Sequence, residues 1–407
     1  MKKNALMYCC SENHTGHPIR AMELARELCE TMEVTVILDD ESSMNVDVPK
    51  SVRLLFLPAL KVDPDSNTFD FEESQQLRHS IVARRDRILD EFEKLKPRLV
   101  IIDNFPFTEH RLKGEVLPLI ERAHNGVYGA SSVVCTTDGI MIDETAKGED
   151  RADTAAALLD KYFDVVIVQS DPVFARLEEF FQPQDTIQTP LYHTGFVVPT
   201  PAKSPPRGEG ILVSAGDGRF GGKLFRTAVE AHRVLWPIAA RPMKIIAGDR
   251  LPEEEWRDLK TSADELDGLT ITRAVTDLRS EMSAARCSIS QCGYNTALSA
   301  IGSQTSSLFV PCLESQRREQ LIRAQRLVYW GAGRLLMPRH LNSASLVNEV
   351  SQLLQFEPRP IQFDMNGVAN AVKVIERVMH VGGPDSSFSL LAQAAGSPSS
   401  KHYLKQA

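Results

Sequence analysis

Two short stretches of the chain contain the residue types that bind anions. Gly216–Gly222, with the sequence GDGRFGG, and Ser290–Thr296, with the sequence SQCGYNT, each lie between a predicted strand and a predicted helix. Glycines let backbone N–H groups approach an anion closely, and the N-terminus of a helix carries partial positive charge. In the second stretch Gly293 permits a tight turn, while Asn295 and Thr296 can cap the helix and bind anion oxygens. Two such loops in one domain predict a bound diphosphate flanked by a base and a sugar.

The first of these loops also matches other phosphate-binding signatures in part. Gly216, Gly218 and Gly221 give the GxGxxG pattern of dinucleotide-binding proteins, but Asp249 lies farther on than the acidic residue expected about 20 residues later. A Walker A loop is excluded, because Leu224 stands where a serine or threonine should hold magnesium. A NAD-dependent dehydrogenase and a plain strand–turn–helix connection therefore stay open as alternatives.

The candidate acid–base residues lie in the first half of the chain. His17 stands in the polar loop after the first apolar run, and histidine, with an ordinary pKa of about 6.5, exchanges protons at neutral pH. Asp103 follows the apolar run 99–102 and is the best carboxylate to orient an imidazole, with a helix-capping aspartate as the alternative. Asp138 is a weaker candidate of the same kind. His14 and His17 predict no metal site, because no further ligand set accompanies them.

The composition is that of an ordinary globular protein. The chain has 407 residues, of which 43% are apolar and 25% charged, and this length predicts two or three domains. A net charge of −8 argues against non-specific binding of nucleic acid, which depends on clustered Lys and Arg. Seven scattered cysteines with no CxxC pair predict neither a zinc site nor a disulfide framework. They favour a reducing cytoplasm, and neither a signal peptide nor a transmembrane helix is expected.

Short apolar runs alternate with helical patterns, which predicts βαβ units around parallel sheets. In the first half we expect strands at 5–10, 34–38, 52–57, 99–102, 132–136 and 165–168, and helices at 18–30 and 75–95. In the second half we expect strands at 211–214, 243–247, 269–272, 287–290 and 308–310, and helices at 224–235, from about 295, at 319–329 and at 366–380.

The proline-rich stretch 199–210 is the best candidate for a linker. We therefore predict an α/β protein with two Rossmann-like domains, 1–200 and 201–381, followed by a disordered tail over 382–407. Ligands of open α/β sheets bind at the carboxyl ends of the strands, so both sets of candidate residues should face one cleft.

Several stretches of the second half resemble the donor domain of GT-B glycosyltransferases. They are Gly293–Leu298 (GYNTAL), Val310-Pro311, Arg318–Ala324 (REQLIRA) and a turn at Gly331. The resemblance is to family 28, whose best-known member adds N-acetylglucosamine to a peptidoglycan lipid precursor. More narrowly, it is to a bacterial subgroup with a GYNT…EQLIRA pattern, and it is strongest over 285–340.

In the first half Thr15–Arg20 resembles the glycine–histidine loop of the same enzymes, and the whole resemblance covers roughly 5–380. It implies a GT-B fold with an acceptor-binding first domain and a donor-binding second domain. The implied reaction is inverting and metal-independent transfer of a sugar from a UDP- or dTDP-sugar, with no other cofactor. The acceptor is an unidentified small molecule or lipid-linked sugar, and peripheral contact with a membrane is compatible with this.

The resemblance also implies roles for individual residues. It places Gly216, Gly218, Gly293, Asn295 and Thr296 at the diphosphate, Val275 and Asp277 at the nucleobase, and Glu319 and Gln320 at the donor sugar. Inverting transfer needs a base for the acceptor hydroxyl. His17 is our candidate for that base, with Asp103 as its partner or substitute.

One position departs from the family's pattern. Ser299 stands where relatives often carry a glutamate that binds the ribose hydroxyls, and a short neutral hydroxyl cannot replace a bidentate carboxylate. This favours tolerance of a thymidine-diphosphate sugar, of the kind used to tailor specialised metabolites. Two further hypotheses stay open: a nucleotide-sugar hydrolase or epimerase of the same fold, and a catalytically silent nucleotide-sugar-binding subunit.

Overall fold

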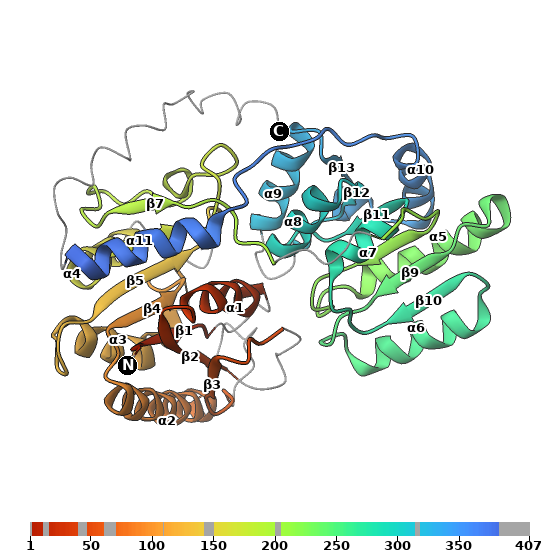
Figure 1. Cartoon of the computed structure of the whole chain (residues 1–407). Coiled ribbons are helices and arrows are strands. Elements are labelled where there is room, and N and C mark those ends of the chain that lie inside the picture. The colour runs from red at the N-terminus through yellow and green to blue at the C-terminus, as the bar shows by residue number, and fades with distance from the viewer. Residues whose placement is uncertain are drawn as a thin grey trace.

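The computed structural model describes residues 2–10, 16–39, 47–60, 71–108, 110–141, 150–199, 205–313 and 318–381. His14 and the predicted disordered tail over 382–407 lie outside these residues. The described chain forms two α/β units, each built on a parallel sheet, as the alternation of apolar runs and helical patterns predicts (Figure 1).

The first unit has a seven-stranded sheet in the order β3-β2-β1-β4-β5-β6-β7, with every neighbouring pair parallel. Its strands are β1 (Lys3–Tyr8), β2 (Met32–Leu38), β3 (Val52–Phe56), β4 (Leu99–Asp103), β5 (Ser132–Thr137), β6 (Val165–Val168) and β7 (Leu191–His193). Its helices are α1 (Gly16–Leu28), α2 (Phe71–Leu95), α3 (Lys113–His124) and α4 (Asp150–Tyr162).

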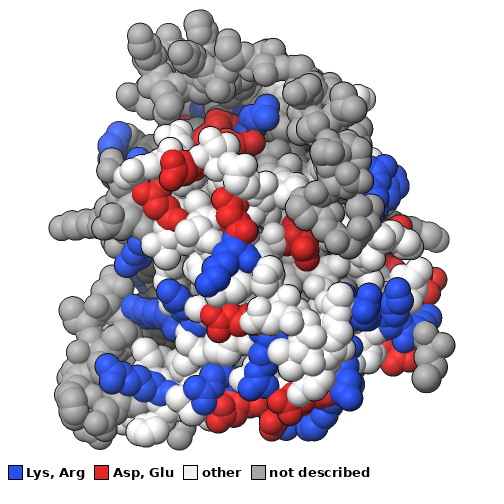
Figure 2. Space-filling model, turned by 90° about the vertical axis from the view of Figure 1, so that its left-hand side faces the viewer, with Lys and Arg blue, Asp and Glu red and all other residues white. Residues whose placement is uncertain are grey.

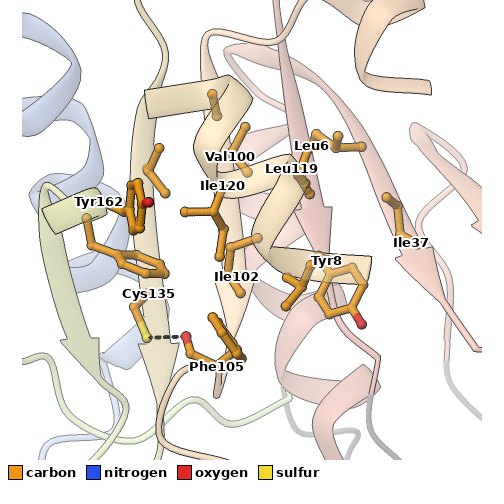
Figure 3. Packing of buried hydrophobic residues seen from close by; sticks show 14 of the residues in the cluster. Leu6, Tyr8, Ile37, Val100, Ile102, Phe105, Leu119, Ile120, Cys135 and Tyr162 are labelled. Atoms are coloured by element: carbon orange, nitrogen blue, oxygen red, sulfur yellow. Dashed lines mark hydrogen bonds between the residues drawn. The ribbon is translucent and has the colours of Figure 1, made fainter. Parts of the chain in front are cut away.

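Both faces of this sheet are covered, which is why its central strands are continuous apolar runs. All five residues of β4 are buried. On one face, side chains of β4 such as Val100 and Ile102 pack with Ile120 of α3 (Figure 3). Ile88 of α2 belongs to the same buried cluster. On the other face, α1 packs on side chains of the opposite parity, such as Ile101.

The second unit has a six-stranded parallel sheet in the order β10-β9-β8-β11-β12-β13. Its strands are β8 (Ile211–Ser214), β9 (Met243–Ile246), β10 (Leu269–Thr272), β11 (Cys287–Ser290), β12 (Ser306–Phe309) and β13 (Gly333–Leu335). Its helices are α5 (Gly222–Ala239), α6 (Glu253–Glu265), α7 (Leu278–Ala284), α8 (Tyr294–Ser303), α9 (Arg318–Tyr329) and α10 (Ser343–Leu353).

The last helix, α11 (Gly367–Val381), packs on the first unit, although we had assigned it by sequence to the second domain. Ala371, Ile375 and Val378 join the buried cluster that contains the core side of α1. Figure 1 shows α11 lying beside α1 and the first sheet. The amphipathic pattern predicted the helix, but an apolar face does not show which core it covers.

The two units also share one buried apolar cluster. Phe174 and Phe196 from the first unit and its exit segment lie in it with Tyr294 of α8, Ala324 of α9 and Phe363. The ring centroids of Phe196 and Tyr294 are 6.0 Å apart. Because an extensive apolar contact restrains domain motion, we expect the two units to move little relative to each other on this side of the molecule.

Each sheet has one point where the strand order reverses. In the first sheet the chain runs from β1 outward through β2 and β3, then returns to place β4 on the other side of β1. In the second sheet β8 and β11 have the same relation. Such switch points leave a crevice between diverging loops, where ligands of open α/β sheets bind.

Candidate functional site

His17 and Asp103 meet at the switch point of the first sheet. His17 lies in the first turn of α1, and Asp103 is the last residue of β4. Nδ1 of His17 is 2.7 Å from Oδ2 of Asp103, and both side chains are almost buried, with 12% and 9% exposed. An Nδ1–H that donates to the carboxylate leaves Nε2 as the basic nitrogen of the ring. The polar contacts that the structure gives Asp103 are with side chains rather than with the N–H groups of a helix start.

The neighbours of Asp103 keep its carboxylate charged. Thr136 donates its hydroxyl to Oδ1 at 2.8 Å, and Arg20 lies 3.8 Å from Oδ2. Burial raises the pKa of Asp103, but the hydrogen bond and charge of His17, the charge of Arg20 and the Thr136 hydroxyl together hold it below its ordinary value. The carboxylate is therefore ionised at neutral pH and can stabilise a positively charged imidazole.

Asn104 completes the contact with the imidazole. Its φ of 60° is in the left-handed region, which asparagine tolerates better than most residues. This turn lays the side-chain amide of Asn104 against the ring nitrogens of His17. Because Nδ1–H is donated to Asp103, the amide oxygen rather than the amide nitrogen is the atom that suits Nδ1. Sequence analysis did not identify Asn104, since the signal for its role is a backbone conformation.

The two glycine loops meet at the switch point of the second sheet. Nε2 of Gln291 donates to the carbonyl of Phe220 at 2.9 Å, so the loops after β11 and β8 are hydrogen-bonded to each other. Gly218 has a φ of 88°, and a Cβ there would lie 1.9 Å from the carbonyl oxygen of Ala247. Only glycine fits at this position, because the loop after β9 presses against it.

Gly216 and Gly293, by contrast, face open space. A Cβ added at either would have no atom of the described residues within 4 Å. Backbone at such positions can be approached by a ligand, as the sequence analysis expected for a diphosphate.

The N-terminus of α8 points into this open space. Gly293 is its N-cap residue, and having no side chain it makes no capping hydrogen bond of its own. The expected capping by Asn295 or Thr296 is wrong, because both lie inside the first turn, and Thr296 is buried. Their role at a diphosphate stays a prediction.

Two buried hydroxyls lie beneath this helix end. Ser214 and Ser290 end the paired strands β8 and β11 and are 3% and 0% exposed. Neither Oγ atom has a hydrogen-bond partner within the described part of the chain. Since buried hydroxyls are usually paired, these two are candidates for ligand contacts that the sequence analysis missed.

The remaining predicted donor residues lie around the same sheet edge. Asp277 caps α7 by accepting from the Ser280 backbone at 3.1 Å and from its hydroxyl at 2.6 Å. Val275 packs on the shared apolar cluster. Within α8, Ser299 is half-buried.

Glu319 and Gln320 begin α9. Glu319 is half-buried and Gln320 is buried. The side-chain oxygen of Gln320 accepts a hydrogen bond from the backbone N–H of Cys312 at 3.0 Å. Gln320 therefore holds the segment after β12 in place, and its two amide N–H groups and the second lone pair of its oxygen can still serve a sugar hydroxyl.

The surface charges and the character of the helices bear on which partners the described part of the chain can bind. Among the described residues on the face in Figure 2, Lys and Arg are interspersed with Asp and Glu, so this face has no continuous basic surface of the kind that nucleic acids need. None of the described helices has the length and apolar character to span a membrane.

No group of three or more His, Cys, Asp or Glu side chains in the described ranges is arranged to hold a metal ion. All seven cysteines are buried and none forms a disulfide.

No model of a known protein family matches the chain, and no curated protein matches it in sequence. Solved structures do match. CalG4, the calicheamicin glycosyltransferase, is 16% identical with a TM-score of 0.57, over 98% of this chain and 100% of that one. MurG of Acinetobacter baumannii is 14% identical with a TM-score of 0.54, over 92% and 99%. The spinosyn rhamnosyltransferase SpnG, complexed with thymidine diphosphate, is 16% identical with a TM-score of 0.54, over 97% and 100%. The fold of this chain is the GT-B fold.

Proposed function

We propose that this protein transfers a sugar from a nucleoside-diphosphate sugar to an acceptor hydroxyl, with inversion at the anomeric carbon. The observation that carries the proposal is the pairing of two complementary sites, one at each switch point. An ionised Asp103 orients His17 at the first, and paired glycine loops open around the start of α8 at the second. Structural neighbours named as glycosyltransferases support it, among them CalG4 and SpnG.

In this proposal the second switch point binds the donor. The diphosphate lies against the N–H groups at the start of α8, where Gly216 and Gly293 leave room. Partial positive charge at a helix N-terminus favours an anion without a full counter-charge. The Ser214 and Ser290 hydroxyls can add hydrogen bonds, and for this reason we propose that the reaction needs no protein-bound metal.

The first switch point supplies the base. The acceptor hydroxyl gives its proton to Nε2 of His17 while its oxygen attacks the anomeric carbon of the donor. The bond from that carbon to the phosphate oxygen breaks, and the electron pair leaves with the diphosphate. Asp103 stabilises the imidazolium that forms, and the start of α8 stabilises the leaving anion.

The donor nucleotide is proposed to be thymidine or uridine diphosphate. Ser299 replaces the family's usual carboxylate, so the site loses little when the 2′-hydroxyl is absent. SpnG has been solved with thymidine diphosphate and with spinosyn aglycone, and it shares the fold of this chain. Together with the GYNT…EQLIRA pattern, these points support a family-28-like enzyme that acts on a small-molecule or lipid-linked acceptor.

A panel of nucleotides tests the proposal first. A ligand that binds only the folded state raises the melting temperature by mass action. We expect stabilisation by uridine or thymidine diphosphate and their sugars, and none by NADH. Stabilisation by NADH alone would indicate a dehydrogenase.

Reaction assays then separate transfer from hydrolysis. Nucleotide release should require an added acceptor hydroxyl, with the sugar recovered on that acceptor. Stoichiometric release in water alone would indicate a nucleotide-sugar hydrolase.

A further inference from the structure

Arg20 occupies the centre of the contact between the two units. It lies one helical turn after His17 on α1, and its side chain is 3% exposed. Nη2 is 3.8 Å from Oδ2 of Asp103, and Nη1 is 3.8 Å from Oδ2 of Asp138, at the end of β5. The guanidinium therefore bridges the carboxylate that holds His17 and a second carboxylate nearby.

The other side of Arg20 rests on the second unit. Its guanidinium carbon is 4.7 Å from the ring centroid of Tyr294, within the range of a cation–π contact. The Tyr294 hydroxyl donates to the carbonyl of Gln169 at 2.8 Å and accepts from the backbone N–H of Val197 at 3.1 Å. Tyr294 follows Gly293 directly, so the loop with the open glycine is anchored in the first unit.

Arg323 of α9 strengthens the same junction. Its Nη1 donates to the carbonyl of Cys292 at 3.0 Å, and its Nη2 lies 3.5 Å from Oδ2 of Asp138. Asp138, which the sequence analysis ranked below Asp103, therefore lies between one arginine from each unit.

The hydrogen bonding of Arg20 is incomplete. Nε and Nη2 have no hydrogen-bond partner among the residues that the structure describes, and the whole residue is 2% exposed. A buried guanidinium usually saturates its five donors, because desolvation without compensation is costly. Hydrogen bonds therefore do not explain why Arg20 is buried here. Its positive charge lies between the carboxylates of Asp103 and Asp138 and the ring of Tyr294, and it acts on these neighbours.

We propose that Arg20 is a positioning residue whose charge, rather than its hydrogen bonds, acts on the His17–Asp103 pair, and that Tyr294 keeps its guanidinium in place beside the pair. The proton balance of the base is thereby tied to the docking of the loop that carries Gly293. This inference rests on the proposed function, in which His17 is the base and the start of α8 binds the donor.

The direction in which loss of Arg20 should move the titration midpoint of His17 follows from the charges around the His17–Asp103 pair. In the described part of the chain, Cys9 after β1, Arg20 of α1 and Cys135 of β5 are the titratable and charged groups beside the His17–Asp103 pair. Beyond Arg20 lie Asp138 after β5, Tyr294 of α8 and Arg323 of α9. Removing the positive charge of Arg20 favours the protonated imidazole. The titration midpoint of His17 should rise by about half to one pH unit, as expected for loss of a nearby like charge.

The test is an NMR titration of the full-length protein with ¹³C-labelled histidine, with the His17 signal assigned from His17→Gln. Arg20→Met should raise the His17 midpoint, and Arg20→Lys should restore most of the wild-type value. The control is Arg326→Met. Arg326 of α9 also joins the two units, with Nη2 2.7 Å from Glu179, but it does not contact Asp103. The inference is overturned if Arg20→Met leaves the midpoint unchanged, or if Arg326→Met moves it equally.

A second pair of variants tests the dependence on Tyr294 and serves if Arg20→Met does not fold. Tyr294→Leu removes the ring beneath Arg20 and should raise the His17 midpoint. Tyr294→Phe keeps the ring and should leave it near the wild-type value. Equal midpoints for both variants would contradict the coupling.

These titrations need no substrate, so they test the role of Arg20 even if no sugar transfer is detected. Where nucleotide-sugar turnover is found, Arg20→Met should lower kcat and shift the acidic limb of the pH–rate profile upward by the same amount as the NMR midpoint. KM for the donor should change less than about twofold. A loss confined to KM would assign Arg20 to donor binding instead and contradict a positioning role.

Discussion

The two switch points have the same backbone arrangement and opposite chemistry. In both sheets a first strand and the fourth strand of its unit lie side by side, β1 with β4 and β8 with β11, and their loops diverge. The first crevice gathers charged and titratable groups: His17, Asp103 and Arg20. The second offers glycine backbone, a helix N-terminus and two serine hydroxyls. In the function proposed above, the same backbone arrangement serves proton transfer at one switch point and anion binding at the other, depending on which side chains come after the strands.

The difference has a physical basis. A base needs an ionised partner in a site of low polarity, because only there does one carboxylate stabilise the imidazolium strongly. A diphosphate that must arrive and leave is better held by many neutral donors, which need not be desolvated as full charges. Substitutions at each switch point should therefore affect different properties: turnover at the first and nucleotide binding at the second.

The largest effect is expected from His17→Ala. Loss of a general base should lower turnover by about 10²–10⁴-fold, while nucleoside-diphosphate binding stays close to wild type. Steady-state kinetics and calorimetric binding measure the two quantities separately. Wild-type-like turnover in this variant would assign proton transfer to another group.

Gly293→Ala is expected to have the complementary effect. Its φ of −65° suits any residue, and its added Cβ would meet no atom of the described chain. The melting temperature should therefore fall only by the small amount that follows from replacing glycine with alanine at an N-cap. The methyl group would occupy the space of the diphosphate and weaken nucleotide binding by at least about tenfold, or 1.4 kcal/mol. Unchanged nucleotide affinity would show that the ligand does not approach this turn.

A matched glycine gives the control. Gly218→Ala puts a methyl group 1.9 Å from the carbonyl oxygen of Ala247 at a φ of 88°. It should therefore lower stability as well as binding, because the loop must move. If Gly293→Ala destabilised the protein as much, its effect on binding would carry no information about the site.

Asp103→Asn tests the charge at the first crevice through stability. The pKa of Asp103 is lowered in the folded protein, so its ionisation stabilises the fold above the ordinary carboxyl pKa of about 3.9, and this contribution is lost as the pH falls through the folded value. At pH 7 the variant should be less stable by about 1–3 kcal/mol. Urea unfolding at several pH values should show this gap narrowing below about pH 4. A gap independent of pH would mean that the carboxylate charge contributes nothing.

The smallest expected effect concerns the donor base. Ser299 gives no carboxylate to grip both ribose hydroxyls, so uridine and thymidine diphosphates should bind within about tenfold of each other. Ser299→Glu should shift the preference toward uridine diphosphate. If uridine diphosphate already binds at least ~100-fold tighter in the wild type, a gap of about 2.7 kcal/mol, the thymidine hypothesis is wrong.

Features that depend on strand ends could be predicted best from the sequence. His17 comes after one buried strand and Asp103 ends another, and parallel strands bring such ends together, so their meeting could be expected from position. The glycine loops could be expected for the same reason. Several elements were not predicted. Among them, β7 and β13 have three residues each, and α6 buries only Leu259, which gives little apolar periodicity. The helices α3, α4, α7 and α10 were also missed.

Contacts between distant segments could not be predicted. Tyr294 lies within a motif that resembles a donor loop, yet its hydroxyl binds the first unit at Gln169. The partner of the Gln320 oxygen, the N–H of Cys312, depends on how the segment after β12 returns to α9. The first contact depends on how the two units pack, and the second on the path of the chain within the second unit, so neither can be read from the sequence.

The most direct measurement is a crystal structure of the protein with a nucleoside diphosphate, either uridine or thymidine. We predict that the diphosphate lies at the second switch point, against the start of α8 between Gly216 and Gly293, with the Ser290 hydroxyl within hydrogen-bond reach. Nε2 of His17 should be left open toward the donor. A diphosphate bound at His17 and Arg20 in the first unit would contradict the division of chemistry between the two crevices.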